Sequence, residues 1–182
     1  MLTLLLTLPG VAVTYNGDEI GMLDYREITW EDTLDPQACN TNDPLNYEWA
    51  SRDPQRTPFQ WDATDFAGFK TAAGSQPWVQ VHPNYRNLNL EAQKVAEKSF
   101  YKFYQQLASI RNNEVFVNGD FASYVFNKEV LSYSRTAAGE SFVVIINFGS
   151  FDHILNVNDM GVGFPVSAEV VSAGSKTSYD TG

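Results

Sequence analysis

Basic residues are scarce in this chain. Its 182 residues contain 12 Lys and Arg against 22 Asp and Glu, which gives a formal net charge of −10. Binding to nucleic acid through phosphate contacts needs clustered basic side chains that release counterions, and no run of Lys or Arg here forms such a stripe. We therefore expect no nucleic-acid partner, and a neutral or cationic ligand suits the charge better.

Cysteine and histidine are almost absent. Cys39 is the single cysteine, so an internal disulfide framework is excluded. His82 and His153 have no Cys or His at metal-ligand spacing, and the acidic residues between positions 24 and 43 lack the spacing of an EF-hand loop. The sequence also has no Gly-rich phosphate loop and no nucleophile elbow. We expect neither a metal nor a cofactor.

No apolar run is long enough to cross a bilayer, which takes about 20 residues. The longest at the start is Met1–Leu8. It is either the core of a signal peptide, although no basic residue precedes it, or the end of a buried helix that stops at Pro9-Gly10. We favour the helix, followed by a buried strand over Val11–Tyr15. A chain that opens inside a helix with no capping residue is typical of a piece of a longer protein.

Apolar and aromatic residues are plentiful. Hydrophobic residues make up 43% of the chain, with 12 Phe, 9 Tyr and 4 Trp, so the chain has ample material for a packed interior. Its length suits one domain, or one domain and part of another. A complete α/β barrel of about 250 residues does not fit.

The stretch from residue 24 to residue 89 is polar and rich in proline. Proline at this density excludes long helices and central strands. Long loops are usually functional or disordered, and the aromatic residues argue against disorder. We expect an ordered functional loop anchored by its aromatic side chains: Trp30, Trp49, Phe59, Trp61, Phe66, Phe69 and Trp78.

Helical periodicity begins at Leu90, with Asn89 as its capping residue. We expect one helix from Leu90 to about Asn112, whose apolar residues recur at spacings of four and three. These residues are Ala96, Phe100, Phe103, Leu107 and Ile110.

Short strands are expected beyond the helix. The alternation and the turn residues predict strands at 120–126, 130–135 and 142–147, with weaker candidates near 153–157 and 166–172. Evenly spaced short strands are typical of an antiparallel sandwich. The chain is therefore expected to contain two domains, 1–113 and 114–182.

Two arginines four positions apart, Arg52 and Arg56, lie in the proline-rich segment Ser51–Asp62. A guanidinium held by a rigid backbone can bind a carboxylate or sugar hydroxyls with two parallel hydrogen bonds. Composition alone leaves the alternative of a surface loop with ordinary salt bridges.

Upstream, Asp18 and Glu19 are adjacent and point in different directions, so they cannot form the facing carboxylate pair of a glycosidase. We expect them to accept backbone N–H groups, with one reaching a pocket as the alternative.

Three motifs occur in a specific order: Leu8–Met22, then Arg52–Asp62 with Ala67-Gly68-Phe69, then Gln76–Tyr85 with Asn89–Gln93. Together they resemble the α-glucosidase (maltase) branch of the α-amylase superfamily, glycoside hydrolase family 13. The stretch Asp35–Cys39 is similar to the one found in insect maltases.

The resemblance implies a fold. Residues 1–113 would be the C-terminal end of a TIM (β/α)8 barrel: Met1–Leu8 ends the seventh helix, Val11–Tyr15 is the eighth strand, and Leu90–Asn112 is the eighth helix. Residues 114–182 would be the antiparallel β-sandwich domain appended to such barrels. The long segment after the strand would then lie on the catalytic face.

The resemblance also implies an activity. Members are retaining glycosidases whose Asp nucleophile, Glu acid/base and second Asp follow strands four, five and seven, so we expect no catalytic residue in this chain. The chain alone is expected to be inactive and to need the upstream remainder of the barrel. Arg56, and secondarily Arg52, is expected to bind the terminal glucose of a maltose-like oligosaccharide. Asp18, Glu19, Phe59 and Trp61 are expected to support the site from behind.

An alternative comes from another class of protein. The amino-acid transporter heavy chains resemble this branch but use the barrel as a non-catalytic ectodomain. The segment Arg52–Asp62, here called the arginine loop, is intact and favours the enzyme, because a protein that no longer binds sugar has no need to keep Arg56 in its Thr-Pro-aromatic-Gln-Trp setting. From the insect maltases we expect an extracellular or membrane-attached location.

Overall fold

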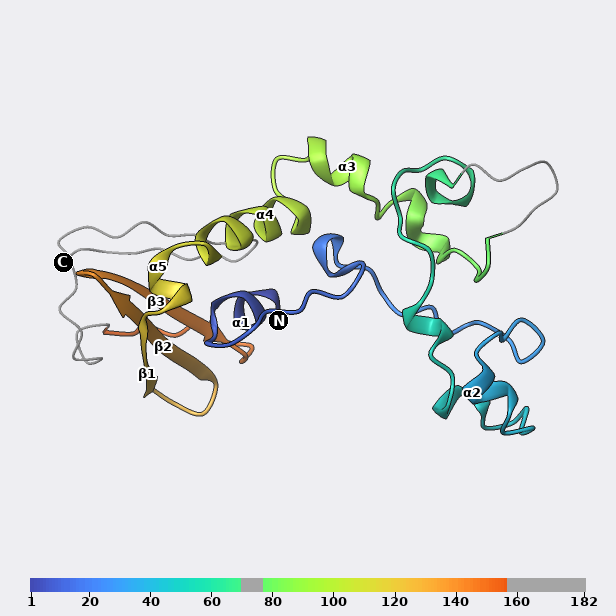
Figure 1. Ribbon diagram of the computed structural model, residues 1–182, viewed down its shortest axis with the longest axis horizontal. Coiled ribbons are helices and arrows are strands. Elements are labelled where there is room, and N and C mark those ends of the chain that lie inside the picture. Colours follow the sequence, from blue (N-terminus) through green and yellow to red (C-terminus); the bar gives the residue numbers. More distant parts are fainter. Residues whose placement is uncertain (70–76, 157–182) are drawn as a thin grey trace. The chain divides into compact units, whose positions relative to one another are not determined.

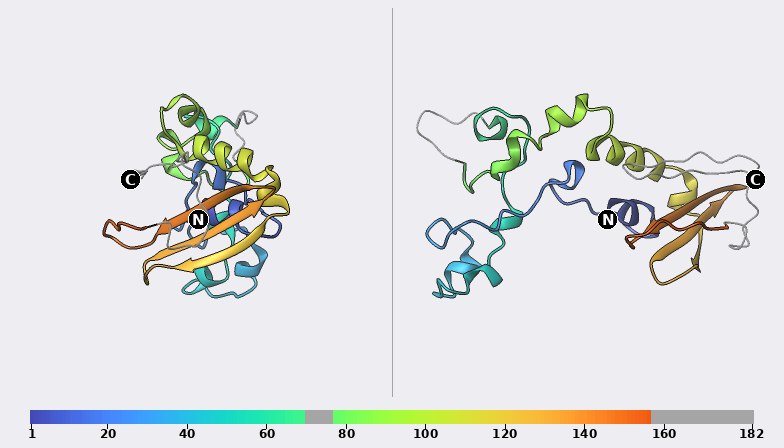
Figure 2. Two further views of the ribbon diagram at one scale, coloured as in Figure 1. Left: turned by 90° about the vertical axis from the view of Figure 1, so that its left-hand side faces the viewer. Right: turned by 180° about the vertical axis from the view of Figure 1, so that it is seen from behind.

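The computed structural model describes residues 1–69 and 77–156 (Figures 1 and 2). They form two compact units. One contains Met1–Val13 and the described residues from Phe103 onward, and the other is Thr14–Lys102. The units follow contacts in space, and the domain division at residues 113 and 114 stays a prediction.

The first unit contains an antiparallel sheet of three strands in the order β1-β2-β3 (Figure 1). The strands are β1 (Asp120–Val125), β2 (Val130–Ala137) and β3 (Glu140–Asn147). All three strong strand predictions are confirmed. β2 and β3 are joined by the two residues Ala138 and Gly139, which both have positive φ, 52° and 81°. Positive φ at both positions is what a two-residue hairpin turn of type I′ requires, and the twist of such a turn matches that of the strands.

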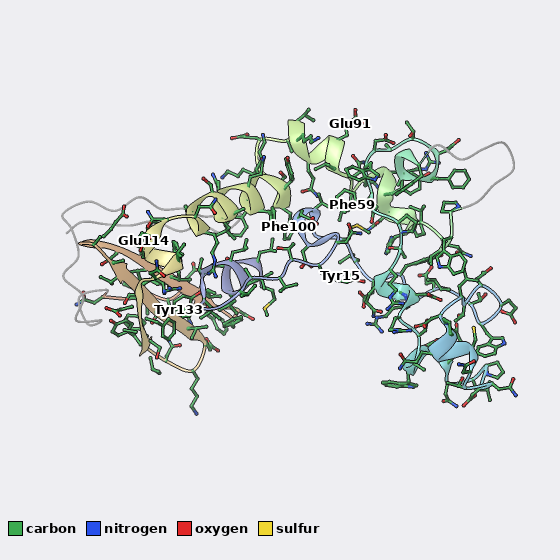
Figure 3. All side chains as sticks on the ribbon, viewed as in Figure 1. Tyr15, Phe59, Glu91, Phe100, Glu114 and Tyr133 are labelled. Carbon is green, nitrogen blue, oxygen red and sulfur yellow. The ribbon has the colours of Figure 1, made fainter. Side chains whose placement is uncertain are left out.

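The core of this unit lies where the sheet meets three helices, α1 (Leu2–Thr7), the part of α4 (Phe100–Arg111) from Phe103 on, and α5 (Glu114–Val117). Burial of apolar side chains there supplies the main stabilising term. The buried residues are Leu6, Leu107, Val115, Phe116, Val130, Tyr133 and Val144 (Tyr133 is labelled in Figure 3).

A sandwich needs a second sheet, and the described residues contain one sheet only. Residues 153–156 form no strand, so the weaker prediction near 153–157 is wrong for that part. The candidate strand at 166–172 lies outside the described residues.

The second unit is built from short helical turns. These are η1 (Asp18–Ile20), α2 (Pro36–Cys39), η2 (Tyr47–Trp49), η3 (Asp53–Gln55), η4 (Asp65–Gly68), η5 (Pro83–Arg86) and α3 (Leu90–Val95). Proline occupies the first or second position of α2, η3 and η5, where its missing N–H costs no hydrogen bond. The prediction of an ordered loop without long helices is confirmed for the described part.

Aromatic anchoring of this loop is only partly confirmed. Phe59 is buried at 9% exposure, but Trp49 and Trp78 are 92% and 78% exposed. Buried aliphatic residues, among them Ile20 and Ile28, fill the interior of the unit instead. The prediction that Trp49 and Trp78 anchor the loop is therefore wrong for this structure.

The predicted single helix from Leu90 to Asn112 is two helices, because the chain becomes extended at Ala96 (φ −60°, ψ 146°). Side chains stabilise the break. Ser99 Oγ accepts a hydrogen bond from Lys102 N and donates one to the carbonyl of Gln93, while Gln93 Oε1 accepts from Tyr101 N. These contacts replace the missing intrahelical bonds at the start of α4. Asn89 caps α3 as predicted, accepting from Ala92 N at 2.8 Å.

The predicted buried strand over Val11–Tyr15 is absent from the structure. These residues belong to no strand, and Val11 and Val13 are 92% and 73% exposed. A strand forms only by hydrogen bonding to a neighbouring strand. The sheet of the described residues does not include Val11–Tyr15, so this segment does not form a strand.

Candidate functional site

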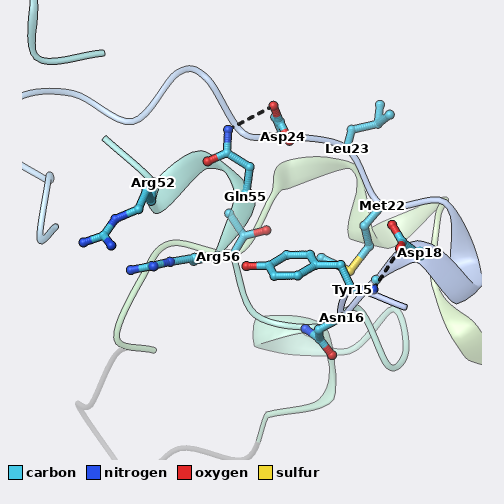
Figure 4. Close-up of a pocket in the computed structure, with 11 residues that line it drawn as sticks. Tyr15, Asn16, Asp18, Met22, Leu23, Asp24, Arg52, Gln55 and Arg56 are labelled. Carbon is cyan, nitrogen blue, oxygen red and sulfur yellow. Dashed lines mark hydrogen bonds between the residues drawn. The ribbon is translucent and has the colours of Figure 1, made fainter. Parts of the chain in front are cut away.

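An open pocket of about 400 Å³ lies between two segments of the second unit (Figure 4). One wall comes from Tyr15–Asp18 and Met22–Asp24, and the other from Arg52 and Gln55–Thr57. Both predicted substrate-binding arginines, Arg52 and Arg56, line this pocket. The two segments are about 30 positions apart in sequence, so the fold, not sequence proximity, brings them together.

The first wall is a tight turn held by its own acids. Asp18 Oδ2 accepts a hydrogen bond from Tyr15 N at 2.9 Å, and Glu19 Oε2 accepts one from Gly17 N at 2.8 Å. Gly17 has φ 104°, a conformation that favours glycine. Both acids therefore bind backbone donors, as expected, and Asp18 also lines the pocket.

The turn is tied to α3 from behind. Gln93 Nε2 donates a hydrogen bond of 2.7 Å to the carbonyl of Ile20, which is fully buried. Gln93 is the same residue that stabilises the break before α4. The helical region thus fixes the position of the first wall.

Backbone and side-chain bonds join the two walls. Tyr25 N donates to the carbonyl of Pro54 at 2.9 Å. Asp24 Oδ2 accepts from Gln55 Nε2 at 3.3 Å across the pocket. The pocket is therefore a feature of one unit with its own internal support.

Arg52 is paired with a buried carboxylate. Its Nε and Nη2 donate to Asp35 Oδ2 and Oδ1 at 2.8 and 2.6 Å, and its backbone N donates to Oδ2 at 2.7 Å. The hydrogen bond from Arg52, opposed by desolvation, holds the pKa of Asp35 well below its usual range, and the same bond raises the pKa of Arg52. Both N–H groups of one guanidinium edge are therefore used inside the protein.

Arg56 is placed differently. Its backbone N donates to the carbonyl of Asp53 at 2.9 Å and ends η3. Its side chain extends along the pocket beside Tyr15 (Figure 4). Among the described residues, no ion pair or hydrogen bond engages the Arg56 guanidinium. Its five N–H donors remain available to a ligand.

Two of the residues expected to support the site, Phe59 and Trp61, lie close to Thr57 in sequence but not in the pocket wall. Phe59 and Trp61 contact each other with ring centroids 4.6 Å apart. Between them Gln60 is fully buried, and its Nε2 donates to Asn84 Oδ1 at 2.8 Å and to the carbonyl of Leu88 at 2.5 Å. This segment is thereby attached to the region just before α3.

No local sequence pattern pairs Asp35 with Arg52, 17 positions later in the chain. From the sequence, the Asp35–Cys39 stretch was only a similarity to insect maltases. The available signal was Asp-Pro, since an Asp before a proline at the first position of a helix is a capping pattern. Asp35 does cap α2, accepting from Gln37 N at 3.0 Å.

The histidines have ordinary structural contacts. His82 Nδ1 accepts from Asn84 N at 3.1 Å, and His153 Nε2 lies 2.9 Å from Glu129 Oε2. Within residues 1–69 and 77–156, no group of three or more His, Cys, Asp or Glu side chains is arranged to hold a metal ion. In the same ranges, no helix combines the length and apolar character that crossing a membrane requires.

Comparison with known proteins decides the family. Residues 1–119 match the family described as Alpha-amylase: Alpha amylase, catalytic domain. The chain belongs to the α-amylase family. Its likeness to solved barrel enzymes of this family also establishes the fold class, α/β barrel elements followed by an antiparallel β region. In the trehalulose synthase MutB from Pseudomonas mesoacidophila MX-45, the match has a TM-score of 0.69 at 33% identity and covers 81% of this chain and 29% of that one.

Two curated relatives of this α-amylase family chain are informative. Maltase 1 of Drosophila virilis is 42% identical over 157 residues, covering 86% of this chain and 24% of that protein. The amino acid transporter heavy chain SLC3A1 of Homo sapiens is 31% identical over 170 residues, covering 92% of this chain and 22% of that protein. The chain spans about a quarter of the length of these relatives.

Proposed function

We propose that this chain is the C-terminal part of a retaining α-glucosidase that hydrolyses terminal α-1,4-linked glucose from maltose and short oligosaccharides. The observation that carries the proposal is Arg56. In a chain of the α-amylase family, its guanidinium lies in a pocket and has no partner among the described residues. An unpaired guanidinium in a pocket is suited to bind a ligand that carries many oxygen atoms.

Arg56 would act on the sugar by hydrogen bonding. Its planar N–H groups can donate to two neighbouring hydroxyl oxygens of a terminal glucose, and a donor that carries charge makes a stronger bond than a neutral one. Holding the ring in one orientation places the anomeric carbon where a carboxylate nucleophile can attack it. The two carboxylates and the stabilising acid of the reaction would come from the upstream part of the full-length protein.

The relatives support this substrate class. Maltase 1 is named for maltose, and its identity of 42% exceeds the 31% of the transporter heavy chain. A non-catalytic ectodomain like that heavy chain is the alternative function. The unpaired Arg56 favours the glycosidase, because an ectodomain that binds a protein partner has no use for a free guanidinium inside a sugar-sized pocket.

We further propose an extracellular or membrane-attached location for the full-length protein, as in the insect maltases that the sequence resembles. Fractionation of cells that express the full-length protein with an epitope tag tests this. Recovery from the medium or the membrane fraction is the expected result, and recovery from the cytosol would contradict it.

The function is tested on the full-length protein with maltose as the substrate. Glucose release is expected, and the product should first appear as the α-anomer, because a retaining enzyme preserves the configuration of the bond. Both are read together, by a glucose assay and by NMR of the fresh product. A folded full-length protein that releases no glucose would exclude the glycosidase and favour the ectodomain.

A further inference from the structure

We infer that Asp35 is a positioning residue for Arg56. It holds the other guanidinium, that of Arg52, and fixes the turn on which Arg56 lies, so that one arginine is left for the sugar. This inference rests on the proposed function and adds to it a residue more than 15 positions away in sequence from the arginine loop.

The first step is the geometry at Asp35. Asp35 is 2% exposed as a residue, and its carboxylate accepts four hydrogen bonds, three from Arg52 and one from Gln37 N. The Asp35–Arg52 pair has the planar two-point form in which arginine binds a carboxylate most specifically. The Arg52 side chain stays 48% exposed beside the pocket, so without Asp35 it would be a second free cation there.

A second set of contacts runs from the backbone of the Asp35 segment to a carboxylate of the Arg52 segment. Asp53 is 3% exposed, and its Oδ2 accepts from the backbone N–H groups of Leu34 and Asp35 at 2.7 and 2.8 Å. Each of the two segments therefore places one buried carboxylate on the other's backbone. This reciprocal arrangement fixes both the distance and the register of the two segments.

The third step leads to Arg56. The carbonyl of Asp53 accepts from Arg56 N at 2.9 Å, so the backbone of Arg56 is set directly by the residue that binds the Asp35 segment. The carbonyl of Pro54, between them, is held by Tyr25 N at 2.9 Å. Two contacts thus connect Asp35 to the backbone of Arg56: Asp35 N donates to Asp53 Oδ2, and Arg56 N donates to the carbonyl of the same Asp53.

A purely structural role would also fit a buried ion pair, so the test must separate the two. A double-mutant cycle does so, because residues that act through one another give non-additive effects and independent residues give additive ones. The four proteins are full-length wild type, Asp35→Asn, Arg56→Ala and the double variant. Asparagine keeps the size of the side chain but places an N–H₂ group or a neutral oxygen against the donors of Arg52.

Initial rates with maltose give kcat and KM. Asp35→Asn is expected to lower kcat/KM roughly 10-fold in the wild-type background and less than about twofold in the Arg56→Ala background. An equal loss in both backgrounds, or no loss in the first, would overturn the inference. The matched control is Asp43→Asn, because Asp43 lies in the same loop and caps its own turn through Leu45 N and Asn46 N. Its kcat/KM should match that of the wild type.

Two further measurements cover a variant that does not fold and a wild type that has no activity. If Asp35→Asn does not fold, the cycle is run with Arg52→Lys, which keeps the charge but gives Asp35 a single donor, and the same non-additivity is expected. If the wild type releases no glucose, the proposed enzyme fails, and the cycle is repeated on maltose binding by calorimetry. An additive cycle there would overturn the positioning role itself, as would the absence of maltose binding.

Discussion

Arg135 on β2 donates a hydrogen bond of 3.1 Å from Nη1 to the carbonyl of Thr7, 128 positions earlier in the chain. Its Nη2 donates to the carbonyls of Phe116 and Gly119 at 3.0 and 3.1 Å. Arg135 is 2% exposed, and no ion pair with it occurs among the described residues. Burial, and then the charge of Arg111, lower the pKa of Arg135. Three backbone segments are therefore joined by one guanidinium.

Replacement of Arg135 is expected to destabilise this unit strongly. Arg135→Met should lower the free energy of unfolding by about 3 kcal/mol, because the carbonyls of Thr7, Phe116 and Gly119 lose a buried donor. Urea unfolding of the full-length protein, followed by fluorescence, measures this. Arg26→Ala is the control: Arg26 pairs with Asp24 at the surface, and an exposed pair contributes roughly 0–1 kcal/mol. Equal effects of the two substitutions would contradict the expectation.

The Asp35–Arg52 pair predicts a pH dependence of stability. Because the pKa of Asp35 is lowered on folding, its stabilising effect is fully present above the pKa of the unfolded carboxyl, about 3.9. The effect is lost as pH falls below that value toward the lowered pKa of the folded state. The stability difference between wild type and Asp35→Asn should therefore shrink between about pH 4 and pH 2. Parallel curves of unfolding midpoint against pH for the two proteins would refute this.

Arg56 is expected to matter for catalysis and not for stability. Arg56→Ala in the full-length protein should lower kcat/KM for maltose about 30- to 100-fold, or roughly 2–3 kcal/mol of transition-state stabilisation, because a charged hydrogen bond to the sugar is lost. The unfolding midpoint should stay within error, since no described residue depends on its side chain. Kinetics like those of the wild type would remove Arg56 from the site.

The 182-residue chain expressed alone is expected to be inactive and poorly soluble. Val11 and Val13 are 92% and 73% exposed, and the sheet of the described residues does not include their segment. Exposed apolar segments of this kind promote association. Glucose release from maltose and light scattering against concentration are the two measurements. Maltase activity of the chain by itself would show that the reaction does not need the upstream residues.

Local patterns predicted much of the fold correctly. Alternating apolar residues gave the three strands, and the cap at Asn89 gave the start of α3. The break at Ala96 was missed because the apolar spacing of four and three continues across it. What ends α3 is a contact among Gln93, Ser99 and Tyr101, and periodicity contains no information on such side-chain bonds.

At the candidate site, too, the sequence predicted the residues but not the contacts between them. The family resemblance gave Arg56 as the expected sugar-binding residue and Arg52 as the secondary one. The sequence could not show that the guanidinium of Arg52 is paired, because its partner Asp35 lies 17 positions earlier in the chain. Likewise, the apolar Val11–Tyr15 segment predicted a strand from composition, while strand formation depends on a neighbour that composition does not reveal.

By itself, the sequence determined the order of elements, the absence of a disulfide framework and the arginine loop with its family resemblance. These follow from local propensity, proline positions and motif order, all of which act over a few residues. Only the tertiary structure decided that Arg52 is the paired arginine, that Trp49 and Trp78 are exposed, and where the long helix breaks. Those outcomes depend on hydrogen bonds and packing between segments distant in sequence, whose energies exist only once the chain has brought the segments together.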